Sequence, residues 1–156
     1  MAVNTIVIEA PPDAVFDVLS DGRLYAEWVV GAHASAPVDP SWPDPGSTLV
    51  HRSGIPPVTL RDTTSVISAN RPGRMKLEAR VRPLVVATVD LTIQPHADGS
   101  MVSMEERVVG GLARYAPDWV NHAAFRRRNT ASLARLRAIV LHRRGRGSPS
   151  GDEPKA

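Results

Sequence analysis

The sequence predicts an α+β domain in which one long C-terminal helix covers one face of an antiparallel sheet. Three observations lead to this fold class. Apolar and polar residues alternate from Val29 to Val109, and turn-forming Pro and Gly residues divide this stretch into strands. The apolar faces of neighbouring strands coincide when their hairpins are placed in register. A long helical pattern then runs from Pro117 to about His142.

The N-terminal segment supplies one strand and two short helices. Val3–Glu9 is short and rich in β-branched residues, and Ala10-Pro11-Pro12 ends it. Pro12 suits the first position of a helix, which Asp21-Gly22 ends. Arg23–Trp28 is typical of a second helical piece. Helices this short are marginal alone, so both must pack against another part of the fold.

The central strands form an antiparallel meander with one apolar face. A hairpin around Asp98-Gly99 places Glu106 opposite Val89, and one around Arg82-Pro83 places Leu77 opposite Val89. In this register the inward residues are Met75, Leu77, Ala79, Val81, Val85, Ala87, Val89, Leu91, Ile93, Val102, Met104, Glu106 and Val108. One face of the sheet is therefore covered and the other meets water.

The final helix provides the cover, and Gly145 is its expected stop. At 100° per residue, one stripe contains His122, Phe125, Asn129, Leu133, Leu136 and Val140. The stripe is apolar only in its C-terminal half, because His122 and Asn129 interrupt the first half. Polar groups at positions where tight packing would favour aliphatic residues indicate a cavity under this part of the helix.

Length and composition set the broad class. The chain has 156 residues, no cysteine and 42% hydrophobic residues. This length predicts one domain that folds without metal or disulfide. The lack of cysteine excludes disulfides, thiol catalysis and thiolate metal sites. No signal segment and no run of about 18 apolar residues is present, so we expect a cytoplasmic protein without membrane insertion.

The positive charge is unevenly placed. Lys and Arg number 19 against 16 Asp and Glu, but residues 143–156 hold enough of the excess to leave the body nearly neutral. Nucleic acids require a dense basic surface, so we expect no nucleic-acid partner. The sequence predicts a ligand-binding domain over residues 1–142 and a disordered basic tail over 143–156. A regulatory or partner-binding role of this tail is an alternative.

Four segments resemble the START-like SRPBCC superfamily, and in particular its polyketide cyclase/dehydrase-like branch. They read YAEWVVG (25–31), PGS (45–47), LRDTTSV (60–66) and RNTASLARL (128–136), and the resemblance extends over about residues 1–142. It implies the helix-grip fold of birch pollen allergen-like proteins. This fold has a curved seven-stranded antiparallel sheet wrapped around a long C-terminal helix, two short helices after the first strand, and a cavity for a hydrophobic small molecule.

Two residues are candidate acid–base groups. Glu106 lies on the inward face, where desolvation would raise the pKa of its carboxyl and suit it to proton transfer. The alternative is that Glu106 pairs with an arginine or that a bulge turns it outward. His122 on the helix stripe could transfer a proton or bind a ligand carbonyl, and it could equally be a cavity-wall residue. Within Arg126-Arg127-Arg128, only Arg126 borders the stripe.

His51 and Asp62 form a second candidate pair. A turn over Gly54–Pro57 would place His51 opposite Leu60 and make it a diagonal neighbour of Asp62. The two side chains would then serve as an acid–base or ligand-orienting pair. Alternatively, inward charges at the sheet edge protect it against edge pairing.

The other candidate residues would line the cavity. Trp28 and Trp119 flank it and could stack on a planar ligand or fill the core. Asn129 would orient the ligand or tie the helix to the sheet. The expected apolar walls are Leu77, Val89, Met104 and Phe125. No motif for a phosphate, metal or covalent cofactor is present, and His96-Ala97-Asp98 has the character of a turn, so we expect no cofactor and no metal.

Two functions remain open at this point. The first is binding of a hydrophobic or partly planar molecule, a lipid or a polyketide-like compound, in the internal cavity of a monomer or homodimer. The second is a cofactor-independent enzyme similar to polyketide cyclases, which would hold a polyketone chain for aldol ring closure. Glu106 or His122 would then remove a proton and Asn129 would stabilise the enolate.

Overall fold

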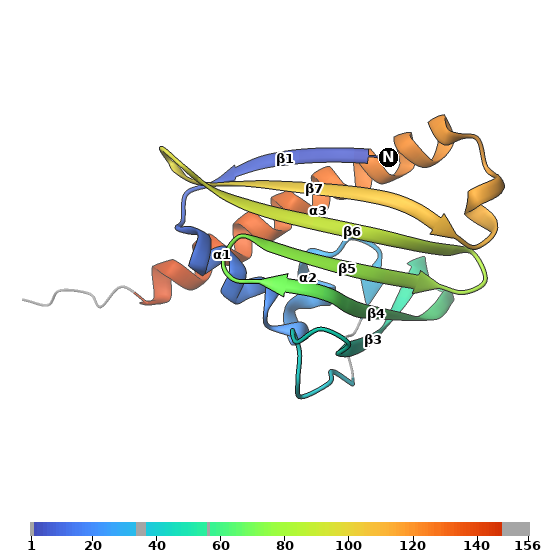
Figure 1. Ribbon diagram of the computed structural model, residues 1–156, viewed down its shortest axis with the longest axis horizontal. Coiled ribbons are helices and arrows are strands. Elements are labelled where there is room, and N and C mark those ends of the chain that lie inside the picture. Colours follow the sequence, from blue (N-terminus) through green and yellow to red (C-terminus); the bar gives the residue numbers. More distant parts are fainter. Residues whose placement is uncertain (1, 34–36, 56, 148–156) are drawn as a thin grey trace, which may run out of the picture.

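A curved antiparallel sheet wraps around the long helix α3 in the computed structural model, as predicted (Figure 1). The structure describes residues 2–33, 37–55 and 57–147. In chain order the elements are β1 (Ala2–Ile8), α1 (Pro12–Leu19), η1 (Gly22–Leu24), α2 (Tyr25–Trp28), β2 (Ala32–His33), β3 (Thr48–Ile55), β4 (Val58–Asn70), β5 (Arg74–Val81), β6 (Val85–His96), β7 (Gly99–Gly110), η2 (Leu112–Tyr115) and α3 (Asp118–Gly147). The predicted α+β helix-grip class is confirmed.

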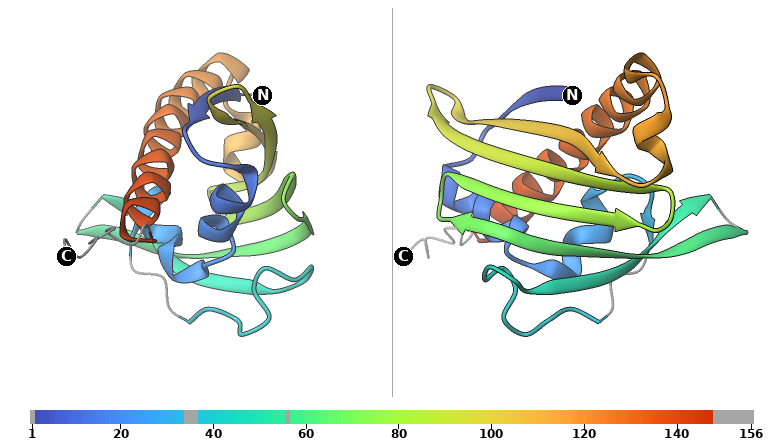
Figure 2. Two further views of the ribbon diagram at one scale, coloured as in Figure 1. Left: turned by 90° about the vertical axis from the view of Figure 1, so that its left-hand side faces the viewer. Right: turned by 45° about the vertical axis from the view of Figure 1, so that its right-hand side comes forward.

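The seven strands are ordered β1-β7-β6-β5-β4-β3-β2 and all neighbours pair antiparallel. The edge strand β1 pairs with β7, and all other neighbours in the sheet are consecutive in the chain. Figure 2 shows α3 crossing the concave side of the sheet, with the short helices beside it. The predicted registers of Leu77 with Val89 and of Val89 with Glu106 are confirmed.

The predicted register of β3 with β4 is wrong by two residues. The strands pair out to Ile55 and Val58, so His51 stands directly opposite Asp62 rather than diagonal to it. The connection is shorter than the sequence pattern indicates, because the strands extend into the segment that we expected to be the turn. A shift of two preserves which side chains share a face, so both residues still point inward.

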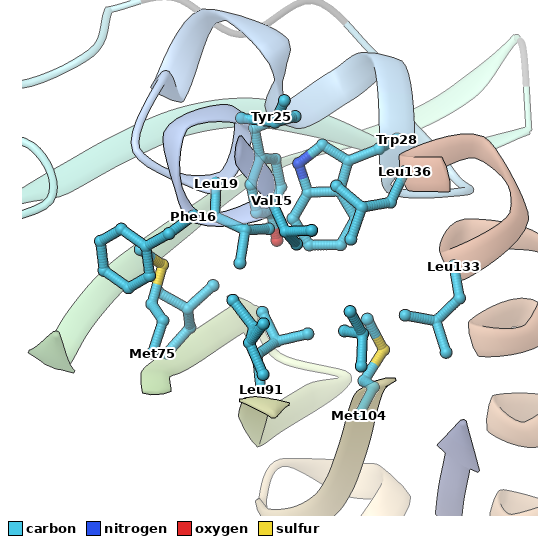
Figure 3. Packing of buried hydrophobic residues seen from close by; sticks show 14 of the residues in the cluster. Val15, Phe16, Leu19, Tyr25, Trp28, Met75, Leu91, Met104, Leu133 and Leu136 are labelled. Atoms are coloured by element: carbon cyan, nitrogen blue, oxygen red, sulfur yellow. The ribbon is translucent and has the colours of Figure 1, made fainter. Parts of the chain in front are cut away.

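The core lies between α1, α2, the sheet and the C-terminal two thirds of α3 (Figure 3). Pro12 opens α1 as predicted, and Val15, Phe16, Val18 and Leu19 form its buried face. From α3 the buried residues are Asn129, Ser132, Leu133, Leu136 and Val140. Leu91 and Met104 belong to the same buried cluster and come from the sheet. The C-terminal half of the predicted helix stripe therefore packs as expected.

The helix α3 runs through Gly145 to Gly147, so the expected stop at Gly145 is wrong, and residues 143–147 of the expected tail belong to this helix. An isolated glycine costs a helix only about 1 kcal/mol relative to alanine. Contacts to the chain after β1 accompany this last turn, since an Nη1 group of Arg144 donates to the carbonyl of Glu9 at 2.7 Å. The remainder of the expected tail, residues 148–156, lies outside the described residues.

A hydrogen-bonded tie joins β1 to α3. Asn4 Nδ2 donates to the carbonyl oxygen of Arg126 at 3.0 Å and to Thr130 Oγ1 at 2.8 Å. Thr130 Oγ1 itself donates to the Arg126 carbonyl. These bonds join α3 to the edge strand β1. Within the described part of the chain, no helix has the length and apolar character to cross a membrane.

Candidate ligand-binding cavity

A cavity of about 170 Å³ lies between α2, the inward face of the sheet and α3. One water molecule needs about 10–15 Å³, so the cavity has room for a small organic guest. Its lining is Tyr25, Trp28, Val29, Val30, Gly31, Ala32, His51, Ser53, Gly54, Asp62, Leu77, Ala79, Val81, Val85, Ala87, Val89, Met104, Glu106, Phe125, Arg128, Asn129 and Ser132. The walls are mainly apolar, with a few polar side chains among them.

Most of the predicted site residues meet in this cavity. The lining includes Glu106 and the predicted ligand-binding residues Trp28, His51, Asp62, Leu77, Val89, Met104, Phe125 and Asn129. They come from α2, from β3 to β7 and from α3, which the sheet curvature brings around one space. Figure 3 shows Tyr25 and Trp28 on one side of the core and Met104 on the opposite side.

Trp119 and His122 are not among the residues that line this cavity, although we expected Trp119 to flank it and His122 to face the sheet. Trp119 is 75% exposed, and His122 is also exposed. The reason is the path of α3, whose first turns lie beside the N-terminal end of β1, above the other strands (Figure 1). Helical periodicity identifies the residues that share one stripe, but it does not indicate at which residue the helix extends past the strands.

Buried polar side chains connect α2 to the strands β3 and β4. The Tyr25 hydroxyl lies 3.0 Å from Thr64 Oγ1, which lies 3.2 Å from His51 Nε2. The rings of Tyr25 and His51 stack with centroids 4.7 Å apart. On the other side of the imidazole, His51 Nδ1 lies 3.7 Å from Asp62 Oδ2, which accepts a hydrogen bond of 2.8 Å from Ser53 Oγ.

Burial shifts the pKa values of three groups in this cluster toward their uncharged forms. It lowers the pKa of His51 to about 4 and raises the pKa of Tyr25 to about 12. Burial also raises the pKa of Asp62, against opposing hydrogen bonds from Ser53 and from backbone N–H groups. At neutral pH, His51 is therefore a neutral imidazole and Tyr25 a neutral phenol.

Glu106 and Arg128 form an ion pair at the cavity wall. Arg128 Nη2 donates to both carboxylate oxygens of Glu106, at 2.6 and 2.7 Å. The Glu106 side chain is 2% exposed and that of Arg128 is 36% exposed, and the guanidinium also lies over the Phe125 ring. The alternative in which Glu106 pairs with an arginine is confirmed. The expectation that only Arg126 of this arginine cluster borders the inward stripe is wrong, because Arg126 is exposed and Arg128 lines the cavity.

Four cavity-lining side chains carry a buried polar atom with no hydrogen-bond partner among the described residues. These atoms are His51 Nδ1, Asp62 Oδ1, Arg128 Nε and Asn129 Nδ2. Asn129 was a candidate tie between helix and sheet, but Asn4 makes that connection instead. An unpaired buried polar atom costs about 1–3 kcal/mol, so a group entering the cavity that satisfies these atoms is favoured.

Sequence reasoning missed Tyr25, Arg128 and Ser132 as cavity residues. Tyr25 precedes Trp28 by three positions on one helical turn, which is the spacing of a shared face, and this signal was available. Ser132 Oγ accepts a hydrogen bond of 3.0 Å from the backbone N–H of Val30 and so joins α3 to the loop after α2. Neither periodicity nor spacing signals that contact, because the residues are far apart in the sequence.

A comparison with protein-family models shows to which family the chain belongs. The family model described as polyketide cyclase / dehydrase and lipid transport matches residues 2–140. The chain belongs to this family. This match confirms the resemblance to the SRPBCC superfamily. The helix-grip fold observed for this chain agrees with the assignment. No curated protein matches the sequence.

Solved structures share the fold at low sequence identity. Protein CV1439 from Chromobacterium violaceum is 17% identical with a TM-score of 0.68, over 88% of this chain and 95% of that chain. Protein NE0264 from Nitrosomonas europaea is 15% identical with a TM-score of 0.71, over 92% and 95%. Ara h 8.0201 is 10% identical with a TM-score of 0.69, over 90% and 96%. These similarities show the fold alone.

Proposed function

We propose that this family member binds a hydrophobic or partly planar small molecule in the cavity between the sheet and α3. The observation that carries this proposal is a cavity of about 170 Å³ with mainly apolar walls in the interior of the domain. Protein interiors are otherwise close-packed. Ligand sites combine such apolar walls with a few polar groups that fix orientation, and His51, Asp62, Asn129 and the Glu106–Arg128 pair supply those groups here.

The proposal extends to location and partners. We expect a cytoplasmic protein, and a nearly neutral body, with the excess positive charge near the C-terminus, supports the absence of a nucleic-acid partner. The ligand is then the principal partner, bound by each protomer of a monomer or homodimer.

A cavity-filling variant tests the proposal. Ala87 lies in the cavity wall and is 1% exposed, so Ala87→Phe places a ring in the space that the ligand would occupy. Ala134→Phe adds the same ring to the exposed side of α3 and is the matched control. The neutral planar fluorophore Prodan is expected to bind the wild type and Ala134→Phe, and to bind Ala87→Phe at least tenfold more weakly. Equal binding to all three proteins, or none to the wild type, contradicts the proposal.

A second candidate function is aldol ring closure, and the state of Asp62 favours it. Its carboxyl lines the cavity, keeps one oxygen unpaired and has a pKa raised by burial, as a general base requires. Asp62 would remove a proton from the carbon next to one ketone. The resulting enolate would attack the carbonyl carbon of a second ketone, and the alkoxide would take up the proton from Asp62. Asp62 would then remove a second proton from the same α-carbon as the hydroxyl group leaves as water. Glu106 is less suited to this role, since Arg128 engages both of its oxygens.

The simple diketone 2,6-heptanedione separates the two functions, because its ring closure gives 3-methylcyclohex-2-enone and water. An enzyme is expected to accelerate this closure and to lose at least a hundredfold in rate in Asp62→Asn, while Prodan binding persists. No acceleration by the wild type leaves the protein a binder. Acceleration that Asp62→Asn does not change excludes Asp62 as the base.

A further inference from the structure

The four unpaired buried atoms of the cavity-lining residues, His51 Nδ1, Asp62 Oδ1, Arg128 Nε and Asn129 Nδ2, fall into two groups, one on the strands and one on the helix. Asp62 and His51 stand side by side on β3 and β4, whereas Arg128 and Asn129 are consecutive on α3. From this arrangement we infer that the ligand is a neutral molecule with a hydroxyl group for the strand wall and a carbonyl oxygen for the helix wall. The inference rests on the proposed binding function and specifies its ligand class.

The strand wall offers one donor and one acceptor. When the Tyr25 hydroxyl donates to Thr64 and Thr64 donates to His51 Nε2, the proton of the neutral imidazole resides on Nδ1. Nδ1–H is then an unpaired donor beside the unpaired acceptor Asp62 Oδ1. At 3.7 Å, Nδ1 and Asp62 Oδ2 are too far apart to satisfy each other. A hydroxyl group both accepts and donates, so a single hydroxyl can complete both atoms.

On the helix wall, the unpaired buried atoms are both donors. The unpaired atoms there are Arg128 Nε and Asn129 Nδ2, and both carry hydrogen. Asn129 is 1% exposed, so water outside the protein does not readily satisfy its amide. A carbonyl oxygen has two lone pairs and no proton to give, which is the complement of two donors. An aliphatic chain cannot provide this complement.

The charges of the cavity favour a neutral ligand. Arg128 would attract a carboxylate if its charge were free, but Glu106 already compensates it through two short hydrogen bonds. His51 is neutral, and Asp62 adds negative charge whenever it is ionised. A carboxylate on the ligand would therefore enter a cavity with no uncompensated positive charge among its described residues, and this carboxylate would lose its hydration.

Ligands built on one naphthalene scaffold test each part of this inference. The probes are naphthalene, 2-naphthol, 2-acetylnaphthalene, 6-hydroxy-2-acetylnaphthalene and 6-hydroxy-2-naphthoic acid, titrated calorimetrically into the full chain at pH 7. The hydroxyl and the acetyl group are each expected to tighten binding about threefold to tenfold over naphthalene. The hydroxy-ketone is expected to bind most tightly, and the acid at least tenfold more weakly than the hydroxy-ketone.

Two variants assign the gains to the walls. Asp62→Leu and Asn129→Leu replace polar atoms by apolar ones of similar size, and thermal unfolding verifies that each variant folds. Asp62→Leu is expected to remove the advantage of the hydroxyl but to retain that of the acetyl group, and Asn129→Leu to do the reverse. Should either variant fail to fold, the five affinities of the wild type decide the question.

The outcomes separate the inference from the function on which it rests. Equal affinities across the neutral probes, or tightest binding of the acid, overturn the ligand class but leave a cavity that binds apolar guests. Advantages that persist in both variants overturn the assignment of the walls. Absence of binding by every probe contradicts the proposed function itself.

Discussion

His51 and Asp62 face each other across β3 and β4 inside the domain, with Nδ1 3.7 Å from Oδ2 and both side chains at most 3% exposed. A protonated imidazole next to an ionised carboxylate would form a strong pair, yet the pKa of His51 is lowered to about 4. Loss of hydration therefore outweighs the attraction of Asp62. The pair is adjacent without being an ion pair at neutral pH.

The lowered pKa of His51 makes the stability of the fold depend on pH. The unfolded state binds a proton near pH 6.5 and the folded state only near pH 4, so His51 stabilises the fold fully above pH 6.5. This contribution is lost as the pH falls from 6.5 to 4, and it amounts to at most about 3 kcal/mol. Urea unfolding of the wild type between pH 7 and pH 4 measures the slope.

His51→Gln is the control for this pH dependence, because glutamine does not titrate. The difference in free energy of unfolding between wild type and variant is expected to shrink or change sign as the pH falls through this window. The raised pKa of Asp62 acts with the opposite sign, and both proteins share it, so it cancels in the comparison. Parallel curves for the two proteins would show that His51 is not the group responsible.

The Glu106–Arg128 pair predicts unequal effects of removing its two partners. Arg128→Met leaves a carboxylate that is 2% exposed without its counter-ion, whereas Glu106→Gln leaves a guanidinium that is 36% exposed and can turn toward water. We expect a loss of about 2–3 kcal/mol for Arg128→Met and about 1 kcal/mol for Glu106→Gln. Urea unfolding at pH 7 measures both.

The double variant Glu106→Leu/Arg128→Met completes this comparison. It removes both charges and replaces them by apolar groups, so its stability is expected to return close to that of the wild type. A double variant less stable than Arg128→Met alone would mean that the pair contributes more attraction than its burial costs.

The sheet from β5 to β7 was predictable because its alternation is unbroken. Leu77, Val89 and Glu106 align through two hairpins whose turn residues are evident in the sequence. The register of β3 with β4 was not predictable in this way, because it depends on where the chain turns between Ile55 and Val58. Alternation fixes the face of each residue but leaves shifts of two undetermined.

The helix side of the cavity was predicted less well than the sheet side. The stripe correctly placed Asn129 inward, but it also included His122 and missed Arg128. A long arginine side chain reaches a cavity from a position beside the stripe. The exposure of Trp119 depends on how far α3 extends past the strands, which is a property of sheet curvature rather than of local sequence.

Ser132 is expected to hold the loop after α2 against α3. Ser132→Ala removes the acceptor of the Val30 N–H, and an unpaired N–H there costs about 1 kcal/mol. The amide of Val30 is expected to exchange with solvent deuterium faster in the variant, while amides of β6 keep their protection. Ala131→Ser, on the exposed side of the same helical turn, is the matched control. Unchanged exchange at Val30 would contradict this role.

Asn4 is expected to set the position of α3 over the sheet edge and so to affect the cavity from a distance. Asn4→Leu keeps the size of the side chain but removes its donors to the Arg126 carbonyl and to Thr130. The Thr130 hydroxyl still donates to that carbonyl within α3, so only the hydrogen bonds between β1 and α3 are lost. We expect a loss of about 1–2 kcal/mol in the free energy of unfolding.

A purely local role of Asn4 predicts no effect on the ligand, whereas a positioning role predicts weaker binding. The segment of α3 that Asn4 holds also carries Arg128 and Asn129, which line the cavity. Prodan is therefore expected to bind Asn4→Leu several-fold more weakly than it binds Val3→Ala, a control at an exposed neighbouring position of β1. Asn4 is not among the cavity-lining residues, so Asn4→Leu leaves every lining side chain in place. Weaker binding by this variant would therefore show that the hydrogen bonds between β1 and α3 determine the geometry of the site.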